Sequence, residues 1–269
     1  MIIFKSINRL NKEVNFKANI GFVPTMGALH KGHFSLIKSS KKKCKKTLVS
    51  IFVNPSQFDK KNDYKNYPRN LKRDIKILKI LKVDYLLIPK INEIYKNKKT
   101  MKIKLNKKDN ILCVKYRPGH FEGVLAIINQ FLINIKAKFM FLGEKDYQQI
   151  HLLKKFIKSK FKTKIIPCKT VRLNNSLAYS SRNFLLSKNE IQKASLISNS
   201  VRSFYLSIKK NFRNKNNINE IKKNIESKRI KVDYFELRNK KNLSKKIDKN
   251  NFKIFIAYYI NNIRLIDNF

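Results

Sequence analysis

Short apolar runs alternate with amphipathic stretches over the first two thirds of the chain. The runs predict strands at 20–23, 47–53, 85–88, 139–142 and 164–167. The stretches between them predict helices at about 32–43, 68–81, 122–135 and 147–159, the second with Pro68 in its first turn. Strands that alternate with helices are typical of an α/β fold, here a Rossmann-like, doubly wound parallel sheet with helices on both faces.

The pattern changes near Val171. Residues 173–183 are polar and predict a loop, and helices are predicted at 188–207 and 218–227. Two strand-like runs follow, at 231–237 and 252–260. We therefore expect a Rossmann-like domain over residues 1–172 and a smaller C-terminal α+β lid domain over residues 173–269.

Length and composition narrow the class of protein. With 269 residues and 42% hydrophobic residues, the chain can bury a sizeable core. No apolar run approaches the ~18–20 residues that cross a bilayer, and the N-terminal segment lacks the features of a signal peptide. The cysteines, Cys44, Cys113 and Cys168, have neither metal-ligand spacing nor a disulfide pattern. These features predict a cytoplasmic protein without a membrane partner.

The charge is unusual, because 62 Lys and Arg against 17 Asp and Glu give a net charge of +45. One interpretation is a nucleic-acid binder. The other is a composition biased towards Lys, Asn, Ile, Phe and Tyr, as A+T-rich codons produce. We favour the second, because the lysines are spread over the whole chain and accompanied by asparagine. No specific nucleic-acid partner is expected, although weak, salt-sensitive binding to polyanions is.

The first candidate site is the segment PTMGALHKGH, Pro24 to His33, where the first long strand gives way to a helix. In open α/β sheets this edge binds ligands, and a helix N-terminus suits an anion. His30 and His33 are three residues apart and share a face of a helical turn, where two imidazoles can donate to phosphate oxygens. The alternatives are two structural histidines or half of a zinc site, although no acidic or Cys partner lies at ligand spacing.

Two further segments carry groups suited to a nucleotide. FLGEKDYQQ (141–149) lies at the end of a strand and before a helix. Its Lys145 suits a phosphate, and its Asp146 suits a ribose hydroxyl or a helix cap. LAYSSRN (177–183) places two hydroxyls and a guanidinium in a loop that can close over a triphosphate, or cap the next helix.

Two more segments are equally compatible with turns. VNPSQF (53–58) offers Gln57, whose amide can bind a substrate hydroxyl and carboxylate, within a turn-rich Asn-Pro-Ser run. RPGHFEG (117–123) opens the apolar helix and is read equally well as a turn and cap.

Together these segments resemble the pantothenate synthetases, which are nucleotidylyltransferases related to class I aminoacyl-tRNA synthetases and share an HxGH-type signature. The resemblance runs in order through PTMGALHKGH, SIFVNPSQF, YPR (67–69), RPGHFEGV, FLGEKDYQQ, VRLNNSLAYSSRNFLLS, VDYFEL (232–237) and RLIDN (264–268). It implies an ATP-dependent ligase that joins pantoate to β-alanine through a pantoyl-adenylate, releasing pyrophosphate and AMP.

The resemblance also implies roles for individual residues. Catalysis falls to His30, His33, Lys145, Ser181 and Arg182, with His33 matching the histidine often written as the family's proton donor. Gln57 and Gln149 would hold pantoate, and Gln57 would also border β-alanine. Mg²⁺ would accompany ATP without a dedicated protein metal site, and a homodimer is expected. The residues implied to line the ATP site are Pro24, Thr25, Met26, Gly27, Ala28, Leu29, His30, Lys31, Gly32, His33, Gly143, Glu144, Lys145, Asp146, Val171, Tyr179, Ser180, Ser181 and Arg182.

Several positions depart from the family pattern. Before the 177–183 loop, here called the clamp loop, the family usually has Glu, Asp and Gly where this chain has Leu173, Asn175 and Ser176. A Gly is also usual near Asn261. Lys31, Gln130 and Tyr179 also differ from the usual residues. These departures bear on stability and loop closure, and we expect Ser176 to slow that closure. Two other functions stay open at this stage: another adenylate-forming enzyme of the same fold, and a basic nucleic-acid binder.

Overall fold

The computed structural model describes residues 1–95 and 103–269, which form two compact units. The first contains Met1–Glu144 and Gln149–Lys169, and the second contains Lys145–Gln148 and Thr170–Phe269. The division predicted after residue 172 stays a prediction. Each unit is described separately.

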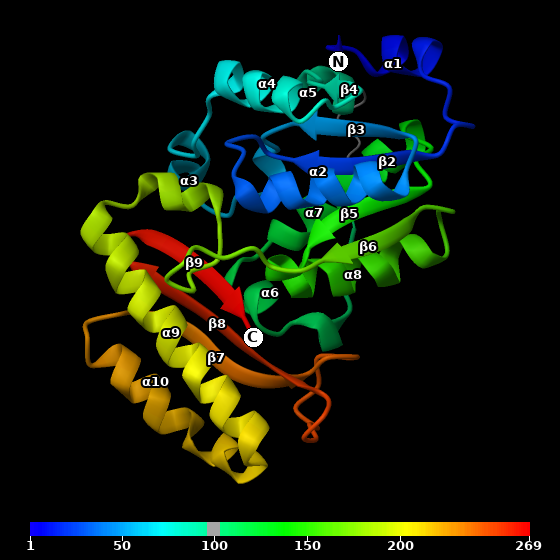
Figure 1. The fold of residues 1–269 in the computed structure, drawn as a ribbon. Helices are drawn as coiled ribbons and strands as arrows, with labels where there is room; N and C mark the ends of the chain where they lie inside the picture. The colour runs from blue at the N-terminus through cyan, green and yellow to red at the C-terminus, as the bar shows by residue number, and fades with distance from the viewer. Residues whose placement is uncertain (96–102) are drawn as a thin grey trace. The chain divides into compact units, whose positions relative to one another are not determined.

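The first unit contains a six-stranded, wholly parallel sheet in the order β1-β4-β3-β2-β5-β6 (Figure 1). From β2 the chain proceeds through β3 to β4 in one direction, and β5 and β6 extend the sheet on the other side of β2. The predicted doubly wound, Rossmann-like sheet is therefore confirmed. The strands are β1 (Ile2–Phe4), β2 (Ile20–Thr25), β3 (Lys46–Ile51), β4 (Tyr85–Leu87), β5 (Phe139–Gly143) and β6 (Lys164–Cys168).

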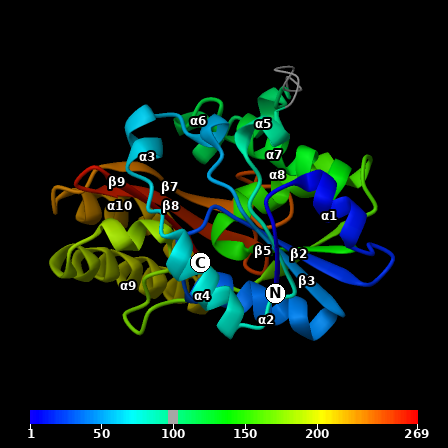
Figure 2. The same ribbon diagram turned by 90° about the horizontal axis from the view of Figure 1, so that it is seen from above.

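Helices cover both faces of this sheet (Figure 2). One face packs against α1 (Ile7–Glu13), α7 (His120–Asn134) and α8 (Tyr147–Lys158), and the other against α2 (Lys31–Lys43) and α4 (Leu71–Ile80). The shorter helices are α3 (Lys61–Lys65), α5 (Ile91–Ile94), α6 (Cys113–Tyr116) and the 3₁₀ helices η1 (Pro55–Gln57), η2 (Lys107–Asp109) and η3 (Glu144–Asp146).

Consecutive strand residues face opposite cores, because side chains alternate along a strand. Phe22 packs with α7 in one core, whereas Val23 packs with α2 in the other. Both side chains are fully buried, which explains why these strands are continuous apolar runs in the sequence. Each such side chain contributes roughly 1.5–3 kcal/mol on burial.

Some predicted boundaries are wrong. The helix predicted over 68–81 begins at Leu71, because Asn70 has non-helical backbone angles and its side chain accepts from Arg73 N at 3.0 Å. Strand β1 and helix α1 were not predicted, since three strand residues and a seven-residue helix give little periodicity.

The second unit is α+β, with a three-stranded antiparallel sheet in the order β7-β8-β9. The strands are β7 (Val232–Asn239), β8 (Phe252–Ile260) and β9 (Ile263–Asn268), and the last was not predicted. Helices α9 (Lys188–Lys210) and α10 (Ile218–Glu226) contribute to its core, with η4 (Ser181–Leu185) and η5 (Phe212–Asn217) preceding them. Buried residues of α9 recur every three or four positions, at Ala194, Ile197, Val201, Phe204 and Ile208.

Over the described residues, no helix combines the length and the apolar character that a membrane crossing requires.

Candidate functional site

The C-terminal ends of β2 and β5 are neighbours in the first unit's sheet. Gly21 pairs with Phe139 and Phe22 with Met140, so the parallel register carries Thr25 and Gly143 to the same edge. The sheet order reverses between these two strands. In doubly wound folds this is the position at which ligands bind. Two of the predicted nucleotide segments therefore begin side by side.

The turn after β2 contains two residues with positive φ angles, and a side chain of α4 holds its backbone. Gly27 and Ala28 have φ angles of +77° and +47°. The N–H groups of Ala28 and Leu29 both donate to the carboxylate of Asp74 on α4, each at 2.8 Å. Burial raises the pKa of Asp74, and the two backbone donors partly oppose that rise. Sequence reasoning missed Asp74, which lies 46 positions from Ala28.

His30 and His33 form a reciprocal capping box at the start of α2. His30 is the N-cap, and its Nδ1 accepts from Gly32 N at 3.1 Å. His33 Nδ1 accepts in turn from His30 N at 3.4 Å. A nitrogen that accepts a hydrogen bond cannot carry the proton, so each neutral ring holds its proton on Nε2. The cap thus makes Nε2 a donor in both rings.

The paired rings suit an anion. Their ring centroids are 4.1 Å apart, so the two imidazoles lie side by side at the start of α2. Helix α2 has 13 residues, and its N-terminal dipole adds positive potential at the same place. This geometry fits the predicted phosphate contact, and the described residues contain no group of three or more His, Cys, Asp or Glu side chains that could hold a metal ion.

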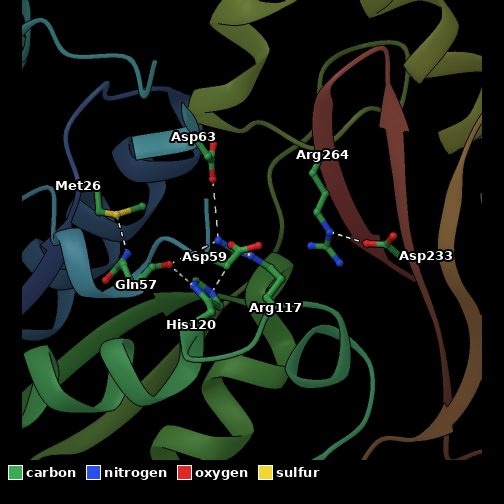
Figure 3. Close-up of polar contacts among 8 residues, drawn as sticks. All are labelled: Met26, Gln57, Asp59, Asp63, Arg117, His120, Asp233 and Arg264. Atoms are coloured by element: carbon green, nitrogen blue, oxygen red, sulfur yellow. Dashed lines mark hydrogen bonds and ion pairs between the residues drawn. The ribbon is translucent and has the colours of Figure 1, made fainter. Parts of the chain in front are cut away.

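Two contacts orient the side-chain amide of Gln57, and Figure 3 shows the one with Met26. Its Oε1 accepts from Asn54 Nδ2 at 3.3 Å, and its Nε2 points at the sulfur of Met26. The Asn-Pro-Ser run does form a turn, the 3₁₀ helix η1, with Asn54 as its N-cap. The turn and the substrate interpretations are therefore compatible, since the turn presents the Gln57 amine towards the Met26 side of the site.

Arg117 and His120 support the Gln57 backbone (Figure 3). His120 Nδ1 lies 2.5 Å from the carbonyl oxygen of Gln57, which only accepts, so Nδ1 carries the proton. Arg117 donates to His120 Nε2 at 3.0 Å, to Gln57 O at 3.4 Å and to Asp59 at 2.9 Å. Burial alone would raise the pKa of Asp59, but the charge and hydrogen bond of Arg117 hold it below its ordinary value.

Helix α7 approaches the same backbone closely at Gly123. A Cβ added there would lie 2.2 Å from Ser56 O and 2.8 Å from Gln57 N. The carbonyl of Gly123 also accepts from Asn54 at 3.1 Å. In the RPGHFEG segment, residues 117–119 therefore form a turn, with Gly119 at φ +79°, and His120–Gly123 begin α7. It also fixes the position of Gln57, which the sequence did not reveal.

A cavity of about 420 Å³ lies at this edge of the first unit, walled mainly by apolar groups of the strand ends. The turn from Met26 to Ala28 lines it, together with Arg69 and Lys90. A cavity of this size and lining is typical of a small-molecule site.

The predicted residues Lys145, Asp146, Val171 and Tyr179 to Arg182 belong to the second unit. The Lys145 ammonium pairs with Asp146 at 2.8 Å. Val171 and Tyr179 are joined by a backbone hydrogen bond of 3.0 Å, and Arg172 and Ala178 form an antiparallel bridge. Residues 171–179 therefore form a small hairpin that overlaps the loop predicted over 173–183, and its turn contains Ser176 at φ +69°.

The clamp residues that follow show the capping chemistry expected of the alternative interpretation. The hydroxyl of Ser180 accepts from Arg182 N at 3.3 Å and caps η4. Ser181 is buried. Asn261, near the second position where the family usually has Gly, also has a positive φ, of +51°.

The structure thus divides the predicted residues between the units. Pro24 to His33, Gln57, Gly143, Glu144 and Gln149 lie in the first. Lys145, Asp146, Val171 and Tyr179 to Arg182 lie in the second. Their individual roles towards a ligand stay predictions.

Comparison with known proteins identifies a single family along the whole chain. The family model for pantoate-beta-alanine ligase matches residues 2–269. The chain is 42% identical to the pantothenate synthetase of Francisella tularensis subsp. novicida (strain U112) over 274 aligned positions, covering 100% of this chain and 97% of the relative.

Two solved structures agree with this result. A pantoate-beta-alanine ligase from Francisella tularensis, complexed with beta-gamma ATP and beta-alanine, is 39% identical, with a TM-score of 0.85 and coverage of 100% and 97% of the two chains. The pantothenate synthetase of Thermus thermophilus is 27% identical, with a TM-score of 0.91 and coverage of 100% and 99%. The resemblance predicted from the motifs is therefore confirmed, and the chain belongs to the pantoate-beta-alanine ligase family.

Proposed function

We propose that this amide-forming ligase condenses (R)-pantoate with β-alanine, using ATP and releasing AMP and pyrophosphate, with the residues below in named roles. The reaction follows from family membership along the full chain. The observation that best supports the roles is the reciprocal cap of His30 and His33, which makes Nε2 a donor in both rings at a helix N-terminus.

In the first step, a carboxylate oxygen of pantoate attacks the α-phosphorus of ATP and pyrophosphate leaves. Negative charge grows on the phosphate oxygens, and preorganised donors lower the barrier most at that point. His30 and His33 donate through Nε2, and Lys145, Ser181 and Arg182 supply further donors. The protein mainly positions the reactants, which itself accounts for a large part of such accelerations.

Recognition of the reactants uses both polar and backbone groups. Gln57 donates through its amine to pantoate, in the orientation that Asn54 fixes, and Gln149 provides a second amide. The turn from Pro24 to Leu29, with Lys31 and Gly32, follows the nucleotide. Gly143 leaves room for it, since an added Cβ would meet no described atom within 4 Å. Glu144, Asp146, Val171, Tyr179 and Ser180 complete the ATP contacts.

In the second step, the amine of β-alanine attacks the acyl carbon of the adenylate. The amide bond forms, the acyl–phosphate bond breaks, and AMP leaves. Exclusion of water protects the mixed anhydride in the interval. We expect Gln57 to border the β-alanine position as well.

Mg²⁺ would accompany ATP and would be held mainly by phosphate oxygens, as this ion usually is. The donor set fits that role, because the described residues offer no carboxylate or imidazole cluster of three or more. When bound, Mg²⁺ supplies additional stabilisation of phosphate charge.

We also propose a homodimer in a reducing, cytoplasmic environment. The three cysteines are buried, and burial raises the pKa of Cys44 and Cys168, which makes these two thiols poor nucleophiles. Sedimentation of the purified protein tests the dimer.

The reaction is tested by exchange of labelled pyrophosphate into ATP, and by AMP release with and without β-alanine. Exchange that requires pantoate and no other acid supports the proposal. Exchange that responds to a different acid identifies another adenylate-forming enzyme instead.

Lys145→Ala tests the assignment of a catalytic cation. It should raise the barrier by about 3–4 kcal/mol, the scale of one preorganised donor. Lys155→Ala is the matched control, because Lys155 is half-exposed and pairs with Asp109. An unchanged kcat and kcat/KM in Lys145→Ala removes this residue from the mechanism.

A further inference from the structure

Two adjacent polar residues at the end of β9 are almost completely buried. Asp267 is 4% exposed and Asn268 is 3% exposed. They end the RLIDN run, which forms part of the family resemblance but has no role in the mechanism above. Buried polar groups of this kind are retained where they fix a particular arrangement of the chain.

Asn268 holds the backbone of Lys145. Its Nδ2 donates to the carbonyl oxygen of Lys145 at 2.9 Å, and its Oδ1 accepts from Lys253 Nζ at 2.8 Å. An ammonium only donates, so Lys253 fixes Oδ1 on its own side and leaves the amine for Lys145. The amide therefore has one defined orientation.

Asp267 holds the hairpin of residues 171–179. Both of its oxygens accept from Arg172, at 2.6 and 2.9 Å, and Arg172 also donates to Ser176 O at 2.9 Å and Asn268 O at 3.0 Å. A bidentate pair fixes both the distance and the plane of the guanidinium. Arg172 thus joins the hairpin turn to the end of β9.

The two anchored segments are far apart in the chain, yet one dipeptide holds both. One carries Lys145, and the other carries Val171 and Tyr179, all within the second unit. Additional contacts fix the first segment: the Tyr147 hydroxyl donates to Lys240 O at 3.1 Å. The Tyr147 ring also packs edge-on against Phe255.

We propose that Asp267 and Asn268 are positioning residues for the adenylation step, which fix the Lys145 segment and the 171–179 hairpin in one arrangement before ATP binds. This inference rests on the proposed function, in which both segments contact ATP. Ordering these segments in advance removes an entropy cost that binding would otherwise incur.

Asn268→Asp is the most direct test. The carboxylate still accepts from Lys253, but it presents an acceptor to the Lys145 carbonyl and repels it. The KM for ATP should rise and kcat should fall, with kcat/KM for ATP lower by about 10-fold to 100-fold, the scale of a misplacement near 1 Å. The KM values for pantoate and β-alanine should stay within about twofold, because Gln57 belongs to the other unit.

Glu236→Gln is the matched control. Glu236 pairs with Arg238 on β7, the strand that β8 separates from β9. It should lower the melting temperature without changing the KM for ATP. Asn268→Asp should instead weaken equilibrium binding of ATP, measured by calorimetry, at a temperature where both variants are folded.

The outcomes separate the two proposals. A wild-type protein without pantoate-dependent pyrophosphate exchange refutes the proposed function. If the wild type is active, two results with Asn268→Asp overturn the positioning role. One is an unchanged affinity for ATP, and the other is an equal loss of affinity for all three substrates as the variant melts. If Asn268→Asp does not fold, Arg172→Lys provides the same test, because it keeps the charge but loses the bidentate geometry; an unchanged KM for ATP in that variant overturns the role too.

Discussion

Replacing His30 with Asn separates two roles that the structure combines in one side chain. As the N-cap of α2, His30 accepts from Gly32 N through Nδ1. As a donor to phosphate, it would use Nε2. Asn is among the best N-cap residues, and its Oδ1 can accept the same hydrogen bond, but it has no group at the position of Nε2. The change therefore keeps the cap and removes the donor.

The expected magnitudes differ in sign and size. His is not a preferred N-cap, so the Asn variant should be as stable as the wild type or up to about 1 kcal/mol more stable. Loss of one preorganised donor should cost about 3–4 kcal/mol of barrier, or about 10²–10³ in kcat. His33→Gln is the companion change, since Gln at the third helical position maintains the reciprocal bond to the N-cap backbone.

Thermal unfolding followed by circular dichroism and pyrophosphate exchange measure the two effects on the same samples. His30→Ala is the control that loses both roles and should be less stable as well as inactive. If His30→Asn keeps kcat within about threefold, its imidazole serves only as a cap and the phosphate role is refuted. A variant that loses stability and activity together would instead show that the cap depends on the imidazole ring itself.

Three other predictions follow from single contacts. Gly123→Ala should lower kcat/KM and destabilise the protein by about 1–3 kcal/mol or more, because its Cβ would lie 2.2 Å from Ser56 O. Steady-state kinetics and urea unfolding measure the two effects, and a variant with unchanged activity and stability contradicts the close approach of α7 to Ser56. Ser176→Gly should stabilise the protein by about 0.5–1 kcal/mol, because the backbone φ of residue 176 is +69°. Turnover should be faster, because Ser176 is expected to slow closure of the loop that follows. A lower melting temperature of the variant refutes the prediction. Asp59→Asn should lower the free energy of unfolding by about 1–3 kcal/mol near neutral pH. Because Arg117 lowers the pKa of Asp59 in the folded protein, the stabilisation is present above the unfolded pKa and is lost as pH falls through the folded pKa. A difference between variant and wild type that does not change with pH contradicts the assignment.

The parallel sheet could be predicted because its strands are buried on both faces. Phe22 and Val23 face different cores, so the sequence shows uninterrupted apolar residues rather than alternation. Strand β9 contains a buried Asp and Asn beside its apolar residues, so its composition hides it. Helix α4 begins later than predicted because Asn70 is its N-cap. Capping rules can identify this residue if Pro68 is not assigned to the first turn of the helix.

The supporting residues could not be predicted, because their partners are distant in sequence. Asp74 meets Ala28 across 46 positions and Arg117 meets Gln57 across 60. A lone Asp in a lysine-rich helix resembles any solvated charge until folding shows that it accepts two backbone N–H groups. The motif residues were recognisable as a set, whereas the groups that hold them emerged only with tertiary structure.

The positions of the charged residues in the structure help to interpret the net charge of +45. Several of the 17 acidic residues have defined structural partners in the described part of the chain: Asp59, Asp74, Asp84, Asp233, Asp267, Glu190 and Glu236. Among described residues, the buried polar group includes Arg117 and Arg238 but no Lys. Most lysines are therefore placed by solvent exposure rather than by packing, with exceptions such as Lys253, which donates to Asn268, whereas these acids accept from backbone N–H groups or from arginines. Compositional bias produces such a distribution, because it accumulates where the fold imposes no constraint, and the absence of a specific nucleic-acid partner stays a prediction.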